Sequence, residues 1–290
     1  MPARPPSPAV RRRRRRVGTA AVLLLGTAVV LGGAYAALSE PDEREVLVRE
    51  RCTATVAAGS FELAPDQAAN AALIAAVAVD RGLPPRAASI AIATAVQESS
   101  LRNLDHGDDA GPDSRGLFQQ RPSQGWGTQE QVMTPTYAAG AFYDALVEVP
   151  GYELLPLTEA AQTVQRSAFP EAYAQREPEG RAFASALTGQ SPAALTCTLR
   201  EATGAGDPLV VRSAADEVFG PLGGTVDGTS LVLDSTGTTG WAVAQWAVAH
   251  AAELSITSVE YADLAWVRGT EGWGPATTDG LRITVAGAVP

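Results

Sequence analysis

The stretch from Arg86 to Ser99 constrains the fold of this chain more than any other. It follows Pro84-Pro85 and reads Arg-Ala-Ala-Ser-Ile-Ala-Ile-Ala-Thr-Ala-Val-Gln-Glu-Ser. Proline is favoured in the first turn of a helix, so the sequence predicts that a helix begins here. A helix that is apolar nearly all round is stable in water only when other elements enclose it. We therefore expect this segment to be the buried central helix of a domain.

The neighbouring sequence predicts a mainly α-helical domain over residues 63–200. Hydrophobic periodicity, with proline near helix starts and glycine past helix ends, indicates further helices near 66–81, 136–148, 157–167 and 178–188. A glycine-rich linker over 201–208 follows. Residues 209–290 have strand-like stretches at 231–233, 256–261 and 281–285 and a helical stretch at 239–253, which predicts a small C-terminal α/β or α+β domain.

The N-terminus predicts export from the cell. Arg11 to Arg16 directly precede residues 17–38, an uncharged stretch of 22 residues that is long enough to cross a bilayer as a helix. The basic flank stays inside, so we expect a cytoplasmic tail over 1–16, a transmembrane anchor over 17–38 and a stalk over 39–62. The protein would then be a single-pass cell-membrane protein with an extracellular body. Because Ala34-Tyr35-Ala36 also suits signal-peptide cleavage, a secreted form cleaved near Ala36 remains the alternative.

The charge distribution excludes nucleic acid as a partner. Seven of the 22 arginines lie in the first 16 residues, and all 32 acidic residues lie from Glu40 onward. The exported part therefore carries 15 arginines against 32 acids, whereas binding to phosphate groups requires a basic face.

Cys52 and Cys197 are the two cysteines of the chain. A pair of cysteines in an exported protein predicts a disulfide, here closing a loop of 145 residues. The alternative is two free, buried thiols.

Glu98 is the candidate catalytic residue, at the C-terminal end of the apolar helix. Burial and the negative end of the helix dipole both disfavour a carboxylate, so both should raise its pKa. A carboxylic acid that stays protonated near neutral pH can protonate the leaving oxygen of a glycosidic bond. The alternative is a glutamate that solvates a helix end.

Two sequence blocks give this glutamate a context. Gln97-Glu98-Ser99-Ser100-Leu101 is followed, after a polar loop, by Gly116-Leu117-Phe118-Gln119-Gln120-Arg121-Pro122. This combination resembles the lytic transglycosylase and goose-type lysozyme superfamily. Residues 83–189 resemble an exported actinobacterial branch of it more closely, through Gln-Arg-Pro-Ser-Gln-Gly-Trp-Gly-Thr at 120–128 and Val-Gln-Arg-Ser-Ala-Phe-Pro at 164–170.

The resemblance implies a lysozyme-like fold, peptidoglycan as the substrate and no cofactor. It assigns the general acid/base to Glu98 and a supporting role to Ser99. It places Gly116, Leu117, Phe118 and Gln119 along the sugar cleft, where Gly116 would let backbone approach the ligand. The third motif of transglycosylases, Ala-Tyr-Asn with a Gly, is absent, and residues 165–170 stand in its place.

The polar loop adds further candidates. Goose-type enzymes position a hydrolytic water with aspartates from this region, which points to Asp105, Asp108, Asp109 or Asp113 without choosing among them. A solvated acidic loop is the alternative. Trp126, between two glycines, is either a platform on which a sugar ring stacks or a core residue beside a turn.

The C-terminal segment to residue 287 resembles a small domain of other secreted proteins. In many of these the last strand begins Asp-His-Val-His, whereas this chain has Asp279-Gly280-Leu281-Arg282. Both histidines of that candidate metal pair are therefore missing, and His106 and His250 are too far apart in sequence to suggest another metal site. We expect a binding or packing module with no bound metal.

Two functions follow from these observations. The first is a cell-surface peptidoglycan glycosidase that cleaves bonds between N-acetylmuramic acid and N-acetylglucosamine with Glu98. The alternative is a non-catalytic peptidoglycan-binding or cell-wall scaffold protein with the same fold. A transporter is excluded because one span without intramembrane polar groups cannot make a path for a solute.

Overall fold

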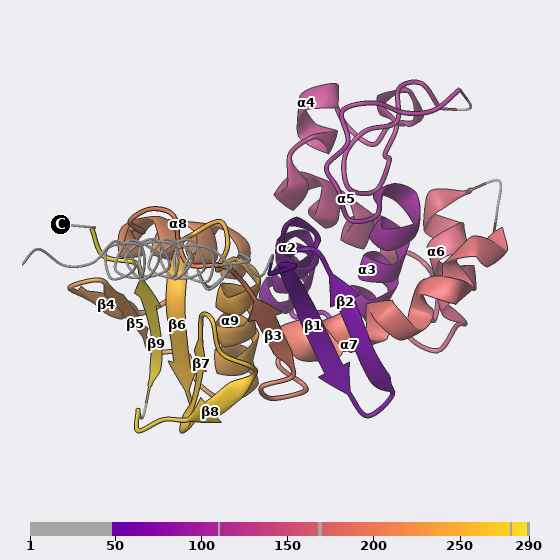
Figure 1. The fold of residues 1–290 in the computed structure, drawn as a ribbon. Helices are drawn as coiled ribbons and strands as arrows, with labels where there is room; N and C mark the ends of the chain where they lie inside the picture. The colour runs from indigo at the N-terminus through magenta and orange to yellow at the C-terminus, as the bar shows by residue number, and fades with distance from the viewer. Residues whose placement is uncertain (1–47, 110, 168–169, 279, 289–290) are drawn as a thin grey trace, which may run out of the picture. The chain divides into compact units, whose positions relative to one another are not determined.

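The chain is an α+β protein. The computed structural model describes residues 48–109, 111–167, 170–278 and 280–288, and within these ranges it contains eight α-helices and two antiparallel sheets (Figure 1). The cytoplasmic tail over 1–16 and the anchor over 17–38 lie outside the described residues. Within the described ranges, no helix is both long and apolar enough to span a bilayer.

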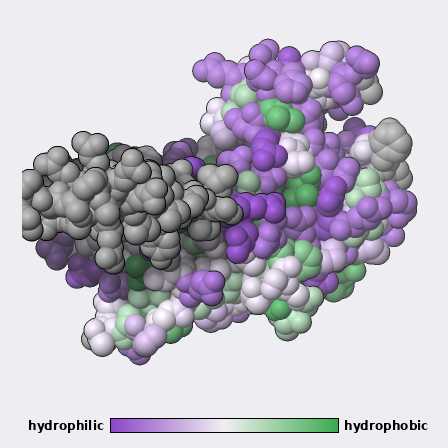
Figure 2. All heavy atoms as spheres, in the orientation of Figure 1, coloured by the Kyte–Doolittle hydropathy of each residue, from purple (hydrophilic) through white to green (hydrophobic). Residues whose placement is uncertain are grey.

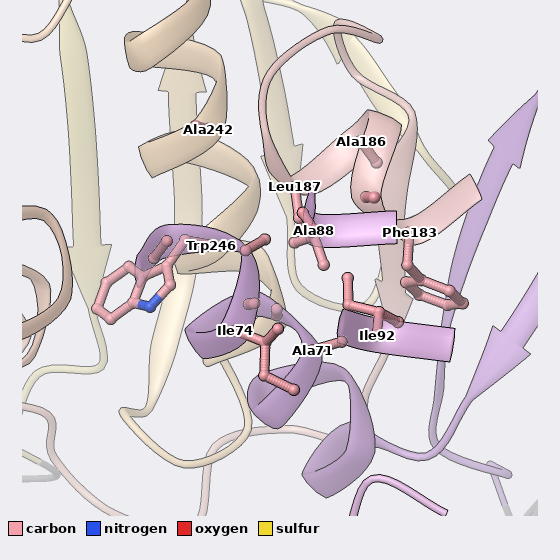
Figure 3. Packing of buried hydrophobic residues seen from close by; sticks show 14 of the residues in the cluster. Ala71, Ile74, Ala88, Ile92, Phe183, Ala186, Leu187, Ala242 and Trp246 are labelled. Carbon is pink, nitrogen blue, oxygen red and sulfur yellow. The ribbon is translucent and has the colours of Figure 1, made fainter. Parts of the chain in front are cut away.

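The central helix is present as expected. Helix α3 spans Pro85–Ser99, and every residue from Ala87 to Val96 in it is buried. It packs against α2 (Pro65–Asp80) and α7 (Glu177–Leu187), with Ile92 of α3 beside Phe183 of α7 in Figure 3. The α7 backbone comes so close that a Cβ on Gly180 would lie 2.8 Å from the Ala93 side chain. Small residues on both helices therefore make this close packing possible.

Shorter helices complete the helical part. These are α4 (Gln129–Val132), α5 (Pro135–Val147) and α6 (Leu157–Gln165), with 3-10 helices at Pro122–Gln124 (η1) and Pro170–Arg176 (η2). The helices predicted at 66–81, 86–99, 136–148, 157–167 and 178–188 are all present, and each bound agrees within two residues. Local periodicity and proline placement determine these segments.

A small sheet joins the two ends of the helical part. Its strands are β1 (Arg51–Val56), β2 (Gly59–Leu63) and β3 (Leu195–Thr198), in the order β2-β1-β3. Cys52 lies directly opposite Cys197 in the β1–β3 pairing, and the predicted disulfide between them is confirmed.

The stalk predicted over 39–62 is wrong for its second half, because residues 51–63 form the β1–β2 hairpin. Cys52 and Ala54 of this hairpin are fully buried. Its partner β3 lies far along the chain, so local patterns did not reveal the pairing.

The C-terminal segment forms a six-stranded antiparallel sheet with two helices packed against it. The strands are β4 (Gly224–Asp227), β5 (Ser230–Leu233), β6 (Ile256–Tyr261), β7 (Leu264–Val267), β8 (Trp273–Pro275) and β9 (Leu281–Val285). Their order is β4-β5-β9-β6-β7-β8. Helices α8 (Pro208–Phe219) and α9 (Gly237–Ala249) pack against this sheet. The predicted strands and the helix near 239–253 are present, whereas α8, β4, β7 and β8 were not predicted.

A buried polar contact fastens this segment to the helical part. Gln245 of α9 is fully buried, and its Nε2 donates to the carbonyl groups of Ala186, at 2.7 Å, and Ser191, at 3.1 Å. Its Oε1 accepts from the backbone N–H of Leu195 at 2.8 Å. Gln245 thus contacts both β3 and the end of α7. The buried hydrophobic residues before and after the linker at 201–208 belong to one core.

The disulfide gives a first prediction. Replacing Cys52 and Cys197 together by serine should lower the free energy of unfolding by up to about 5 kcal/mol, because the unfolded chain regains the freedom of a long loop. Urea titration of the wild type and the double variant would measure the difference. The variant should still fold, since the helical core does not depend on the bond. A midpoint unchanged from that of the wild type would contradict a structural role.

Candidate active site

Glu98 lies in the last turn of α3 and is half-buried. Ala91, Thr94 and Ala95, which precede it on the same face of the helix, are fully buried. Burial therefore raises the pKa of Glu98, in the direction that the sequence predicts. A carboxyl group in this setting holds its proton to higher pH than an exposed glutamate does.

Tyr173 is the partner of Glu98 that sequence reasoning missed. It is fully buried on η2, and its hydroxyl group donates to Oε1 of Glu98 at 2.5 Å. This hydrogen bond favours the carboxylate and so opposes the effect of burial on the Glu98 pKa. Desolvation and the neighbouring Glu98 together raise the pKa of Tyr173, so its hydroxyl stays a donor at neutral pH.

A signal for Tyr173 was present in the sequence. The expected third motif is Ala-Tyr-Asn, and Ala172-Tyr173 carries its first two residues, followed by Ala174. These two residues are the local signal that could have pointed to Tyr173.

Gln165 is a second side chain on Glu98. Its amide hydrogen-bonds to the Glu98 carboxyl group and lowers its pKa, and its Nε2 donates to the Phe118 carbonyl at 2.8 Å. Gln165 is the last residue of α6. It thus ties the candidate acid to the Gly-Leu-Phe-Gln turn.

Ser99 is a support for that turn. Its hydroxyl lies 2.7 Å from the Leu117 carbonyl and 3.1 Å from the Ala95 carbonyl, to which it can donate. The side chains of Leu117 and Phe118 are fully buried, with the Phe118 ring stacked on Phe142 at 4.7 Å between centroids. These side chains hold the turn in place, so any contact with a ligand would come from their backbone.

Gly116 makes a close contact with the protein's own backbone. Its φ is +78°, and an added Cβ would lie 2.2 Å from the Val132 carbonyl oxygen. The approach of Gly116 to the protein's own backbone therefore requires a glycine here, and the approach of a ligand to its backbone stays a prediction. Gln119 has a positive φ of 47°. Its half-buried side chain is the partly exposed one in the block Gly116–Gln119.

The four aspartates of the acidic loop differ in their contacts. The visible surface of this loop beside α4 is mainly hydrophilic (Figure 2). Asp113 accepts hydrogen bonds from Arg121 Nε at 2.9 Å and from the backbone N–H of Ser123 at 3.0 Å. The Ser123 contacts, with help from Arg121, hold its pKa well below the usual range. Asp113 thus fixes the loop.

The other three aspartates are exposed. Asp105 pairs with His106 at 2.9 Å, and this contact lowers the pKa of Asp105. Asp108 accepts from the backbone N–H of Gly111 at 2.8 Å, and its negative charge raises the pKa of Glu98. Of the four, Asp108 is therefore the one whose charge reaches the candidate acid, a distinction that the sequence left open.

A groove with a volume of about 760 Å³ lies beside Gln165. The half-buried Trp126 lines it, and so does Gln165, which also contacts Glu98. Its complete lining is Gln124, Gly125, Trp126, Ala145, Glu148, Val149, Pro150, Thr163, Val164, Gln165 and Arg166. The position of Trp126 leaves it both packed against the core and open to a ligand in the groove.

The described residues offer no group of three or more His, Cys, Asp or Glu side chains arranged to hold a metal ion. At the start of β9, the Leu281 side chain is buried and Nη1 of Arg282 lies 3.5 Å from Oδ2 of Asp227.

In comparisons with known proteins, the chain matches no family model and no curated protein sequence.

The contacts of Glu98 predict how its pKa responds to substitution. Tyr173→Phe removes a hydrogen bond to the carboxylate and should raise the pKa of Glu98. Asp108→Asn removes a repelling charge and should lower it. Titration of the Glu98 side-chain carbon by NMR would measure both shifts. Asp109→Asn removes the same charge from the same loop and is the matched control, with little effect expected. Equal shifts from Asp108→Asn and Asp109→Asn would show that the contact with Asp108 is not specific.

Proposed function

We propose that this protein is a cell-surface peptidoglycan glycosidase, a lysozyme or lytic transglycosylase, with Glu98 as the general acid/base. The observation that carries the proposal is the surroundings of Glu98: a half-buried carboxyl group at the end of a buried helix, with a raised pKa and fixed hydrogen-bond partners. A mobile surface glutamate that only solvates a helix end would have neither the burial nor the two side-chain partners.

The proposed reaction uses the Glu98 carboxyl group twice, first as an acid and then as a base. Protonated Glu98 gives its proton to the glycosidic oxygen as the bond to the sugar carbon breaks, and the sugar becomes oxocarbenium-like. The Glu98 carboxylate then takes a proton from the oxygen that attacks this carbon. That oxygen belongs to water in a lysozyme, or to a hydroxyl group of the substrate itself in a transglycosylase.

Asp108 and Tyr173 have distinct roles in this mechanism. The charge of Asp108 helps Glu98 keep its proton before cleavage, and its carboxylate is the candidate for positioning water in the hydrolytic version. The Tyr173 hydroxyl stabilises the Glu98 carboxylate that forms after proton transfer. Burial and the charge of Asp108 raise the pKa of Glu98, while the hydrogen bonds from Tyr173 and Gln165 stabilise the carboxylate that forms during the reaction.

The alternative is a non-catalytic peptidoglycan-binding or scaffold protein. The groove favours it, since this cavity meets Glu98 only through Gln165 among its lining residues, and a wall polymer held there need not be cut. A protein that binds peptidoglycan without cleaving it would present the same groove residues to its ligand.

Glu98→Gln is the central test. It preserves shape and removes the proton donor, so cleavage of purified peptidoglycan should fall by about 10²–10⁴ while binding is kept. Glu179→Gln is the matched control, because Glu179 is also half-buried with a pKa raised by desolvation but lies on α7 outside the site. It should retain wild-type cleavage.

Mass spectrometry of the released fragments would identify the reaction. Anhydro ends indicate a transglycosylase, and reducing ends indicate a lysozyme. Equal cleavage by wild type and Glu98→Gln would refute this mechanism. Binding of peptidoglycan by both, with no cleavage by either, would favour the scaffold function.

We further propose that residues 17–38 anchor the protein in the cell membrane with the body outside. The support is the arginine run before this segment and the disulfide of the body, which suits an oxidising compartment. Protease added to intact cells should remove a C-terminal tag, and a protected tag would contradict this topology.

A further inference from the structure

The groove beside Trp126 contains two opposite charges that do not neutralise each other. Arg166 and Glu148 both line it and are both exposed. Within the part of the chain that the structure describes, neither side chain forms an ion pair. The groove therefore offers a ligand one cationic and one anionic position.

The helix dipole accounts for a cation at the position of Arg166 but not for an anion at the position of Glu148. Glu148 is the C-cap residue of α5, where the negative end of the helix dipole disfavours a carboxylate. Arg166 is the C-cap residue of α6 and has a left-handed backbone with φ of 53°, a conformation that is uncommon for residues other than glycine. Its backbone N–H donates to the Gln162 carbonyl at 2.8 Å, which fixes its position on the rim.

The remaining lining suits a ligand that is partly apolar. Trp126, Val149 and Val164 supply apolar surface, while Thr163 and Gln124 supply hydroxyl and amide groups. A volume of about 760 Å³ lies in the range of small-molecule and cofactor pockets. The groove is thus large enough for several amino-acid or sugar units.

Gln165 places the groove next to the candidate active site. It lines the groove and at the same time hydrogen-bonds to Glu98 and to the Phe118 carbonyl. A glycan chain at Glu98 would therefore place its side branches within reach of the groove.

We propose, on the basis of the proposed function, that this groove binds the peptide stem of the glycan. The ligand class is a short zwitterionic peptide attached to an amino sugar. Arg166 pairs with a carboxylate of the stem, Glu148 pairs with an amine of it, and Trp126 packs against its apolar part. The groove thus selects peptide-bearing glycan over bare glycan.

Binding to the full-length Glu98→Gln protein tests this inference without cleavage of the ligand. Three probes are compared by calorimetry: a disaccharide-tetrapeptide with a free side-chain amine, the same compound with that amine acetylated, and the disaccharide without peptide. The first should bind most tightly. Because exposed ion pairs contribute about 0.2–1 kcal/mol each, acetylation should weaken binding by about 1.4- to fivefold, and removal of the whole peptide should weaken it further.

Two charge-removing variants assign the contacts. Arg166→Gln should weaken binding of the disaccharide-tetrapeptide, and Glu148→Gln should abolish the effect of acetylation. The matched controls are Arg181→Gln and Glu153→Gln, which remove exposed charges outside the groove and should keep the parent preference.

The outcomes separate this inference from the proposed activity. A protein that binds bare disaccharide as tightly as the peptide-bearing form, or binds neither, overturns the peptide-stem groove. Unchanged binding in Arg166→Gln and Glu148→Gln does the same. If the wild type cleaves no glycan but the stem preference depends on Arg166 and Glu148, the groove stands and the enzymatic function fails. If the wild type cleaves glycan with no stem preference, the reverse holds.

Discussion

The enclosure of α3 is the constraint on which the rest of the structure depends. A helix whose residues from Ala87 to Val96 are all buried cannot be stable until neighbouring elements cover every side of it. The alanines of α3 and Gly180 of α7 let those elements approach closely, and tight packing in turn limits the freedom of the last turn. The position of Glu98 follows directly from this packing, since it lies where the buried helix reaches its partly open end.

The electrostatics of Glu98 come from opposing influences that only the packed state supplies. Burial and the charge of Asp108 favour the protonated acid, while hydrogen bonds from Tyr173 and Gln165 favour the carboxylate. These partners come from three separate segments, and each segment is fixed by its own packing. Tyr173 is held by full burial on η2, and Gln165 is held by its bond to the Phe118 carbonyl. The chemistry proposed for this site therefore relies on a balance and not on one group.

The two ends of the described chain are closed onto the helical part by different means. The disulfide and the β1–β3 pairing tie the segment before α2 to the segment after α7. The C-terminal sheet is attached through α9, which packs against α2 and whose Gln245 satisfies three backbone groups. A buried amide with all these partners specifies one docking arrangement, because any shift would leave polar groups unpaired.

The sequence by itself determined the features that depend on local patterns. Proline placement and hydrophobic periodicity located the helices from α2 to α7 that it predicted, and the apolar run before Glu98 identified both the central helix and the candidate acid. The disulfide followed from the count of two cysteines in a chain expected to be exported.

Tertiary structure alone decided the features that depend on distant partners. It turned residues 51–63 from a predicted stalk into a hairpin, because β3 and Cys197 lie more than a hundred positions away. It brought Tyr173 to Glu98 across 75 positions, distinguished Asp108 from its neighbours in the acidic loop, and set Gly116 against the Val132 carbonyl. The physical reason is common to all of them: burial, charge and steric contact act through space, and a local sequence pattern does not record which distant residue will fill that space.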